Sequence, residues 1–203
     1  MSNSIFYGEK FILNNHLINK VKSGDTHAFK KLFESYKDQI YNLCFRFVNT
    51  REEAEDLCQE VFFKIYKSID SFKSRSKLST WIYRITVNLC LNYKRKENKF
   101  RRLFEGDSFE GFGSELNENL SAPLCDRPDF FLEQKEREKI VQQAINSLPS
   151  NQRVALILQR YEGMSIQEIA EVLGCSVSSI QSRLSRAKEN LCKRLMPFLD
   201  EIL

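Results

Sequence analysis

The stretch Ser165-Ile166-Gln167-Glu168-Ile169-Ala170-Glu171-Val172-Leu173-Gly174-Cys175-Ser176-Val177 decides the fold of the C-terminal part of the chain. Ser165, followed three positions later by Glu168, is the signature of a capping box that begins a helix. Apolar residues then recur at the spacing of one buried helix face: Ile169, Ala170 and Leu173. Gly174 stands where a left-handed residue is needed between two helices. The stretch predicts a helix-turn-helix.

The helix after this turn is amphipathic. Its apolar stripe consists of Ile180, Leu184, Ala187 and Leu191. Small hydroxyls, an amide and arginines occupy the rest of its surface: Ser178, Gln181, Ser182, Arg183, Ser185 and Arg186. Such side chains donate to base edges and phosphates without steric bulk, which suits a DNA major groove. The alternative is an ordinary solvent-facing face of a helical hairpin, but the small-residue turn and the polar stripe together favour DNA recognition.

Composition and charge indicate an all-α chain of two small helical domains. The 203 residues are 42% hydrophobic, enough for real cores, and seven glycines with four prolines leave little material for the turns of a large sheet. The sign of the charge reverses along the chain: twelve Lys and Arg face two acidic residues from Val61 to Leu103, and seven acidic residues face Arg127 alone from Glu105 to Asp129. We therefore predict domains at residues 1–103 and 133–203, joined by a flexible acidic linker at 104–132.

Helical spacing also organises the first domain. One amphipathic helix follows Gly24-Asp25 and carries Phe29 to Phe47. Thr50 and Glu53 have the spacing of a capping box for a second helix, which runs through Ile69. A loop at 71–79 precedes a third helix that starts at Ser79 or Thr80. In the second domain, Ser150 is the expected cap of the helix that follows Pro149.

The second of these helices carries a candidate protein-binding face. With its apolar residues turned inward, the other side presents Asp56, Gln59, Glu60, Phe63 and Lys67. A phenylalanine exposed among polar groups is a plausible anchor for a protein partner. The alternative is that Phe63 packs under a neighbouring helix of its own domain.

The basic block sets aromatic residues among cations. Its candidate DNA contacts are Phe72, Lys73, Arg75, Lys77, Trp81, Arg84, Asn88 and Arg95. Single-stranded DNA requires this chemistry, because unstacked bases gain about 1 to 3 kcal/mol each on an aromatic ring while cations hold the phosphates. Periodicity alone leaves open whether Trp81 is exposed or part of the core.

Other classes of function find little support. The six cysteines form no CxxC pair, and only His16 and His27 could add imidazoles, so we expect reduced thiols, no metal site and no cofactor. There is no secretory leader and no apolar run approaching the roughly 20 residues that cross a bilayer, so the sequence predicts a cytoplasmic protein without membrane insertion. No Walker loop, HExxH or nucleophile elbow supports an enzyme.

Three segments together resemble the small extracytoplasmic-function (ECF) group of bacterial sigma factors. They are 56–66 (DLCQEVFFKIY), 79–88 (STWIYRITVN), and Leu148-Pro149 with the helix-turn-helix, and in this order the resemblance covers residues 25–195. It implies an alternative sigma factor that binds core RNA polymerase, selects promoters and assists strand opening, with an anti-sigma factor as an optional partner.

The resemblance also assigns roles to the candidate residues. It implies that Asp56, Gln59, Glu60 and Phe63 dock on the clamp helices of the largest polymerase subunit. The segment 72–95 would hold the melted downstream promoter element, and the helix with Gln181, Ser182, Ser185 and Arg186 would read the upstream element. The linker would run through the RNA exit path. The competing reading is a helix-turn-helix regulator whose first domain senses a ligand or dimerises, which would need neither the basic-aromatic block nor the exposed Phe63.

Overall fold

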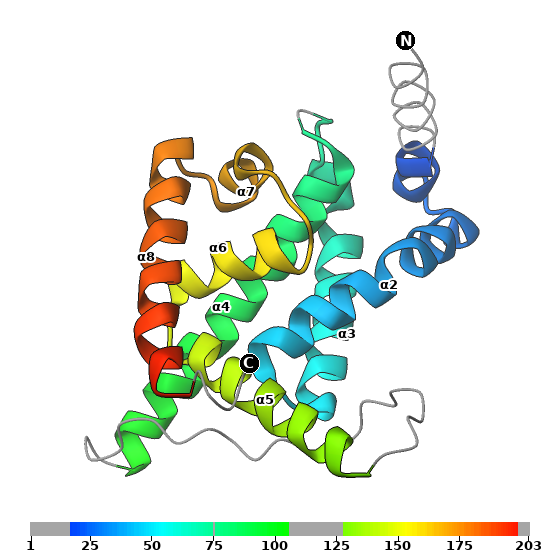
Figure 1. Cartoon of the computed structure of the whole chain (residues 1–203). Coiled ribbons are helices and arrows are strands. Elements are labelled where there is room, and N and C mark those ends of the chain that lie inside the picture. The colour runs from blue at the N-terminus through cyan, green and yellow to red at the C-terminus, as the bar shows by residue number, and fades with distance from the viewer. Residues whose placement is uncertain (1–16, 75, 106–127, 199–203) are drawn as a thin grey trace. The chain divides into compact units, whose positions relative to one another are not determined.

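The computed structural model describes residues 17–74, 76–105 and 128–198, and all regular structure in these ranges is helical (Figure 1). The prediction of an all-helical chain is confirmed. Residues 17–22 are helical, and the further elements are α2 (Thr26–Val48), α3 (Arg51–Ser68), η1 (Ile69–Ser71), α4 (Leu78–Glu105), α5 (Pro128–Asn146), α6 (Ser150–Arg160), α7 (Ile166–Leu173), α8 (Val177–Leu195) and η2 (Met196–Phe198). The chain divides into two compact units, residues 1–98 and 99–203, and the last turns of α4 cross that division.

In the first unit, α2 and α3 form a helical hairpin. The Asp25 side chain caps α2 by accepting hydrogen bonds from the backbone N–H groups of His27 (2.8 Å) and Ala28 (3.1 Å). These bonds stabilise the carboxylate, so they lower the pKa of Asp25. Asn49 ends α2 with a left-handed φ of 67°, a conformation that asparagine tolerates better than most residues, and the chain reverses directly into α3.

Helix α4 adds the third layer of this unit. Its buried residues include Leu78, Ile82, Val87 and Cys90. The Cys90 Sγ lies 3.9 Å from the Sγ of Cys44 on α2, and both side chains are fully buried. The contact with the Cys90 thiol and then burial raise the pKa of Cys44, since the charged thiolate would have no solvent around it.

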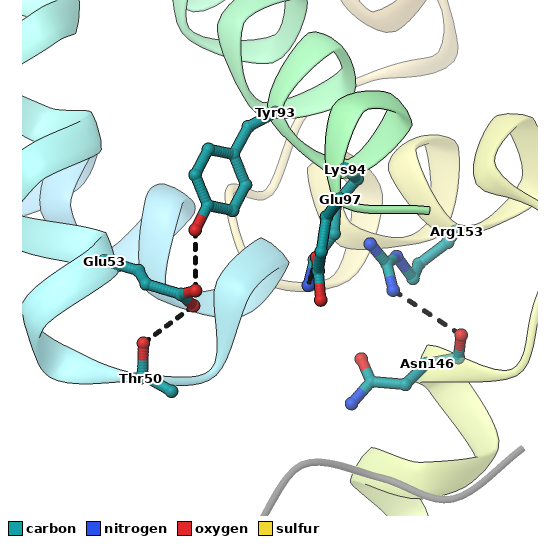
Figure 2. Close-up of polar contacts among 7 residues, drawn as sticks. All are labelled: Thr50, Glu53, Tyr93, Lys94, Glu97, Asn146 and Arg153. Atoms are coloured by element: carbon teal, nitrogen blue, oxygen red, sulfur yellow. Dashed lines mark hydrogen bonds and ion pairs between the residues drawn. The ribbon is translucent and has the colours of Figure 1, made fainter. Parts of the chain in front are cut away.

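The second unit is built around α8, against which α5, α6 and α7 all pack. Its hydrophobic core includes Ile145, Leu148, Leu156 and Ala187, with Val141 and Leu191 packed against it. Two polar contacts connect its elements. Asn190 on α8 donates to Gln152 on α6 (2.8 Å), and Arg153 on α6 donates to the backbone carbonyl of Asn146 at the end of α5 (3.5 Å; Figure 2).

The helix-turn-helix has the predicted local structure. The Ser165 Oγ accepts from the Glu168 N–H (3.2 Å), and the Glu168 carboxylate accepts from the Ser165 N–H (3.1 Å), which completes the capping box. Gly174 has φ 64° and ψ 39°, the left-handed conformation expected of it. Ser176 then caps α8 by accepting from the Ser179 N–H (3.2 Å).

Several predicted boundaries are wrong by a few residues. Helix α4 begins at Leu78 because the backbone of Lys77 already accepts from Trp81 (3.2 Å). Pro149, not Ser150, stands at the cap position of α6. Residues 104–105 and 128–132 of the predicted linker belong to α4 and α5, while 106–127 lie outside the described residues, so the domain limits stay predictions.

The Thr50–Glu53 capping box does not form. No hydrogen bond from the Thr50 side chain caps α3, and its hydroxyl instead donates to the Glu53 carboxylate (2.8 Å). The same carboxylate also accepts a hydrogen bond from the Tyr93 hydroxyl on α4 (2.6 Å). This contact competes with the hydrogen bond that a capping box would make to the Thr50 backbone N–H. Across the described ranges, no helix is long and apolar enough to span a membrane.

Candidate functional site

Helix α3 turns the predicted protein-binding residues outward. Asp56, Gln59, Glu60 and Phe63, which we call the α3 face, are all exposed, while Leu57, Val61 and Ile65 on the opposite side are buried. The Phe63 side chain is 58% exposed. The alternative that Phe63 packs under a neighbouring helix is therefore excluded within the described chain.

The aromatic part of the α3 face is larger than the sequence indicated. The Lys67 ammonium lies 4.1 Å from the centroid of the Phe63 ring, a cation–π contact that orients the ring. Tyr66, one turn along, is 53% exposed and packs edge-on against Phe29 of α2 with ring centroids 5.1 Å apart. The three-residue spacing of Phe63 and Tyr66 was the signal that could have identified the second aromatic residue.

A second surface follows the exposed side of α4. It comprises Lys77, Trp81, Arg84, Asn88 and Arg95, which we call the α4 face; Trp81 is half-buried and the others are exposed. Lys73 is exposed in the loop before α4, and Arg75 lies outside the described residues. Because positions 77, 81, 84, 88 and 95 follow helical spacing, the face forms one continuous stripe.

Phe72 is a correction to the predicted DNA contacts. Its side chain is only 4% exposed and packs against the Trp81 ring with centroids 5.2 Å apart. Its backbone carbonyl accepts from the Lys22 ammonium (2.7 Å), which ties the loop to the helical residues 17–22. A buried ring offers no free face to a base, so Phe72 supports Trp81 from beneath.

The α4 face continues beyond the residues that the sequence analysis selected. Asn92 accepts from Arg95 (3.1 Å) and is exposed, as are Lys96 and Lys99, and Phe100 is 64% exposed. Lys94, by contrast, forms an ion pair with Glu97 (2.6 Å) and is half-buried. The signal for the extra residues was the same helical spacing carried one and two turns further.

Two partly buried hydrogen bonds to the Glu53 carboxylate join the start of α3 to α4 (Figure 2). The Tyr93 hydroxyl on α4 donates to one oxygen of the Glu53 carboxylate (2.6 Å), and the Thr50 hydroxyl donates to the other oxygen (2.8 Å). Burial and the neighbouring Glu53 carboxylate raise the pKa of Tyr93, so the hydroxyl stays a donor. Sequence reasoning missed this contact, because positions 53 and 93 share no local pattern.

The third surface lies on α8. Its buried residues are Ile180, Leu184 and Ala187, as the apolar stripe predicted. Five of the predicted DNA-contacting residues are exposed and Arg183 is half-buried: Ser178, Gln181, Ser182, Arg183, Ser185 and Arg186. The Ser178 Oγ lies 3.0 Å from the Oγ of the cap residue Ser176, so it belongs to the structure of the first turn as well as to the surface.

The described side chains provide no cluster of three or more His, Cys, Asp or Glu that could hold a metal ion. Five cysteines in these ranges are free thiols: Cys44, Cys58, Cys90, Cys175 and Cys192. Cys125 lies outside the described residues.

Comparison with known proteins assigns each unit to a family. Residues 32–100 match Sigma-70 region 2, and residues 138–191 match Sigma-70, region 4. The RNA polymerase sigma-H factor of Pseudomonas aeruginosa is 34% identical over 190 residues, which is 91% of this chain and 95% of that protein. The ECF RNA polymerase sigma factor SigW of Bacillus subtilis is 36% identical over 180 residues, 88% of this chain and 94% of that protein.

The chain belongs to the ECF sigma factors. As an ECF sigma factor it directs RNA polymerase to promoters, and sigma factors are initiation factors, not enzymes. The α3 face and the α4 face both lie in the Sigma-70 region 2 match, and the α8 surface lies in the region 4 match.

Solved structures share the fold of this ECF sigma factor. The sigma factor RpoE of Bartonella quintana, solved in complex with the anti-sigma factor NepR, is 26% identical with a TM-score of 0.61, covering 83% of this chain and 96% of that one. CnrH, solved in complex with the cytosolic domain of CnrY, has the same fold with a TM-score of 0.63 at 22% identity, covering 89% of this chain and 96% of that one.

Proposed function

We propose that the three surfaces divide the work of this sigma factor. The α3 face docks on core RNA polymerase, the α4 face holds the melted downstream promoter strand, and the α8 surface reads the upstream element as duplex. The single observation that carries the proposal is the exposure of Phe63 beside Asp56, Gln59 and Glu60, on a helix whose other side is fully used by the core of its own unit.

The α3 face has the composition of a docking surface. Phe63 supplies a large apolar contact area, and Asp56, Gln59 and Glu60 offer hydrogen-bonding groups in the two turns that precede it. Phe63 and Tyr66, three residues apart and both more than half exposed, extend the apolar surface beyond a single side chain, as at protein interaction sites. The clamp helices of the largest polymerase subunit are the partner that the resemblance to the family implies.

The α4 face suits separated strands. Trp81 is half-buried, with Phe72 beneath it as a rigid support, so one part of the ring remains available for stacking on a base. Exposed Lys77 and Arg84 flank it along the helix, exposed Lys73 lies in the preceding loop, and exposed Arg95 lies further along α4, where these cations neutralise phosphates. Phe72 acts in this proposal as the support of Trp81.

The α8 surface suits a major groove. Its exposed residues are small or end in donors, and the N-terminal turn, where Ser178, Gln181 and Ser182 lie, is the part of a recognition helix that reaches base edges. Arg186, one turn further, can contact a guanine edge or a phosphate.

Two further parts of the proposal rest on related proteins. The similar sigma factor RpoE of Bartonella quintana was solved in complex with the anti-sigma factor NepR, and we include an anti-sigma factor as a partner of this chain. We place the protein in the cytoplasm, where RNA polymerase and the chromosome lie. A ligand-sensing helix-turn-helix regulator is not favoured, because the first unit matches Sigma-70 region 2.

Binding to purified core RNA polymerase tests the proposal. The double variant Asp56→Ala/Gln59→Ala should weaken binding about tenfold or more, which corresponds to about 1.4 kcal/mol, because both side chains lie on the exposed α3 face and not in the core. The matched control is Asp38→Ala/Gln39→Ala, which removes the same two side-chain types from an exposed part of α2. Equal affinity of the two double variants would contradict the docking role.

Measurements on a promoter require a DNA sequence that this sigma factor uses. Wild-type holoenzyme transcribes a randomised duplex library, and a duplex recovered from the transcribed members serves as this sequence. We call it the selected promoter. Failure of the wild-type chain to form a holoenzyme that transcribes from any member of the library would overturn the proposed function as a whole.

A further inference from the structure

The Glu53 carboxylate is shared between two helices. One oxygen accepts from Tyr93 on α4 (2.6 Å) and the other from Thr50 at the start of α3 (2.8 Å), as Figure 2 shows. Thr50 makes no side-chain cap bond to the α3 backbone. The Glu53 carboxylate therefore serves the contact with α4 and not a capping box at the start of α3.

Tyr93 lies at the point where α4 leaves the core. Cys90 is the last buried residue among the described side chains of α4; Leu91, Tyr93 and Lys94 are half-buried, and Arg95, Lys96 and Lys99 are exposed. The apolar contacts that fix α4 therefore end about one turn before the basic part of the helix. The Tyr93–Glu53 hydrogen bond adds a fixed point directly at that boundary.

The acceptor makes this a strong fixed point. A hydrogen bond to an ionised carboxylate is shorter and about twice as strong as one between neutral groups, and partial burial reduces competition from water. The hydroxyl is engaged in this contact, so Tyr93 itself has no role as a DNA donor through that group. Its effect must pass through the helix that carries it.

We propose that Tyr93 is a positioning residue: its bond to Glu53 orients the basic end of α4, with Arg95, relative to the α3 face. Glu53 lies one turn before Asp56 on α3, and Arg95 follows Tyr93 by two residues on α4. The bond thereby connects the helix that docks on polymerase to the helix that holds DNA. This inference rests on the proposed function and adds the element that aligns its two first-unit surfaces.

Tyr93→Phe tests the inference with one atom removed. In wild-type and variant holoenzyme, we expect unchanged affinity for core polymerase. Binding to a pre-melted form of the selected promoter should fall about threefold to tenfold, the range for losing one charge-assisted hydrogen bond that acts through position. The matched control is Tyr41→Phe, which removes a hydroxyl from a half-buried tyrosine of α2 that stacks on Phe45.

Salt dependence and a double variant separate positioning from a purely structural role. If loss of the bond misplaces Arg95, about one phosphate contact is lost. The slope of log affinity against log salt concentration should then become shallower by about one. Tyr93→Phe/Arg95→Ala should bind no more weakly than Arg95→Ala alone, since the bond acts through that residue. Glu53→Gln, which keeps an oxygen acceptor for Tyr93, should retain more binding than Glu53→Ala.

Each alternative outcome is decisive. Additive losses in the double variant, an unchanged salt slope, or equal binding by Tyr93→Phe and Tyr41→Phe would overturn the positioning role while leaving the proposed function intact. A loss of core affinity in Tyr93→Phe would also overturn it, because the bond would then act on the docking helix. If the wild-type holoenzyme fails to assemble or transcribe, the proposed function and this inference fail together.

Discussion

Gly174 sets the turn of the helix-turn-helix through its backbone alone. Its φ of 64° lies in the left-handed region, and a Cβ added there would meet no atom within 4 Å. We expect Gly174→Ala to destabilise the second unit by about 1 to 2 kcal/mol, because the cost is conformational and not a clash. Thermal melting measures it.

Gly174→Asn is the matched control for this substitution. Asparagine adds a larger side chain but tolerates the left-handed conformation better than alanine does. It should therefore melt closer to the wild-type temperature than Gly174→Ala. The reverse order would mean that space, and not backbone conformation, limits the position.

Cys58 gives the molecule a response to alkaline pH. Burial, with a smaller contribution from Cys44, raises the pKa of the Cys58 thiol from its ordinary value of 9.0 to about 11. The folded state thus holds the proton more tightly than the unfolded state, and this contribution to stability is complete below about pH 9 and is lost as pH rises to about 11.

Alkylation by iodoacetamide, followed site by site by mass spectrometry, measures the same shift. The thiolate is the reactive form, so Cys58 should react more slowly than exposed Cys192 at pH 8 and should accelerate until about pH 11. Equal rates for the two thiols at pH 8 would show that Cys58 is not protected.

At single residues, prediction from the sequence succeeded where the cause is local. The Ser165–Glu168 capping box and the left-handed Gly174 depend on neighbours in the chain, and both are confirmed. Phe72 and Thr50 were misassigned because their partners, Trp81 and the Tyr93-bound Glu53, come from tertiary packing. A loop phenylalanine among lysines has the same pattern whether it is exposed or buried.

Among the helices, α4 is the one that we expect to assist opening of the promoter strands, through its α4 face. Trp81→Ala should permit closed complexes of holoenzyme on the selected promoter but reduce opening, because the stacking surface for an unpaired base is lost. A template with a pre-melted bubble should restore much of the transcription. Permanganate reactivity of unpaired thymines measures the opening directly.

Stability is the control for Trp81→Ala. The ring is half-buried and covers Phe72, so the variant also loses packing, at a cost below the roughly 3 to 5 kcal/mol of a fully buried tryptophan. A variant that melts like the wild type and opens linear promoters normally would refute the stacking role. One that is unfolded at the assay temperature would show that the packing of Trp81 on Phe72 is needed for folding, and would contradict a role confined to stacking.

The sequence predicted which helices exist better than it predicted where they begin and end. Periodicity identified α2, α3 and the two helices of the helix-turn-helix, because each buries one face along its whole length. It placed the end of the first domain near residue 103, whereas α4 runs to Glu105 as one helix of 28 residues. Beyond Cys90 most described positions of α4 are polar, so no apolar repeat marks how far the helix continues.

For the whole molecule, the two-part organisation followed from charge and periodicity, and the family matches fall separately on the two units. The surfaces could be predicted as faces, since exposure follows helical spacing. Their connection through Glu53 and Tyr93 could not, because it joins positions 40 residues apart with no repeated pattern between them.

That separation along the chain has a consequence for synthesis. The contacts that bring α4 to α2 and α3, Cys44 with Cys90 and Glu53 with Tyr93, span 46 and 40 residues. The N-terminal unit therefore completes its fold only after Tyr93 has left the ribosome, and N-terminal domains generally fold first during translation. A nascent chain reaches this stage before α8 has been made, so the α3 face is formed on the growing polypeptide before the helix proposed to read the promoter exists.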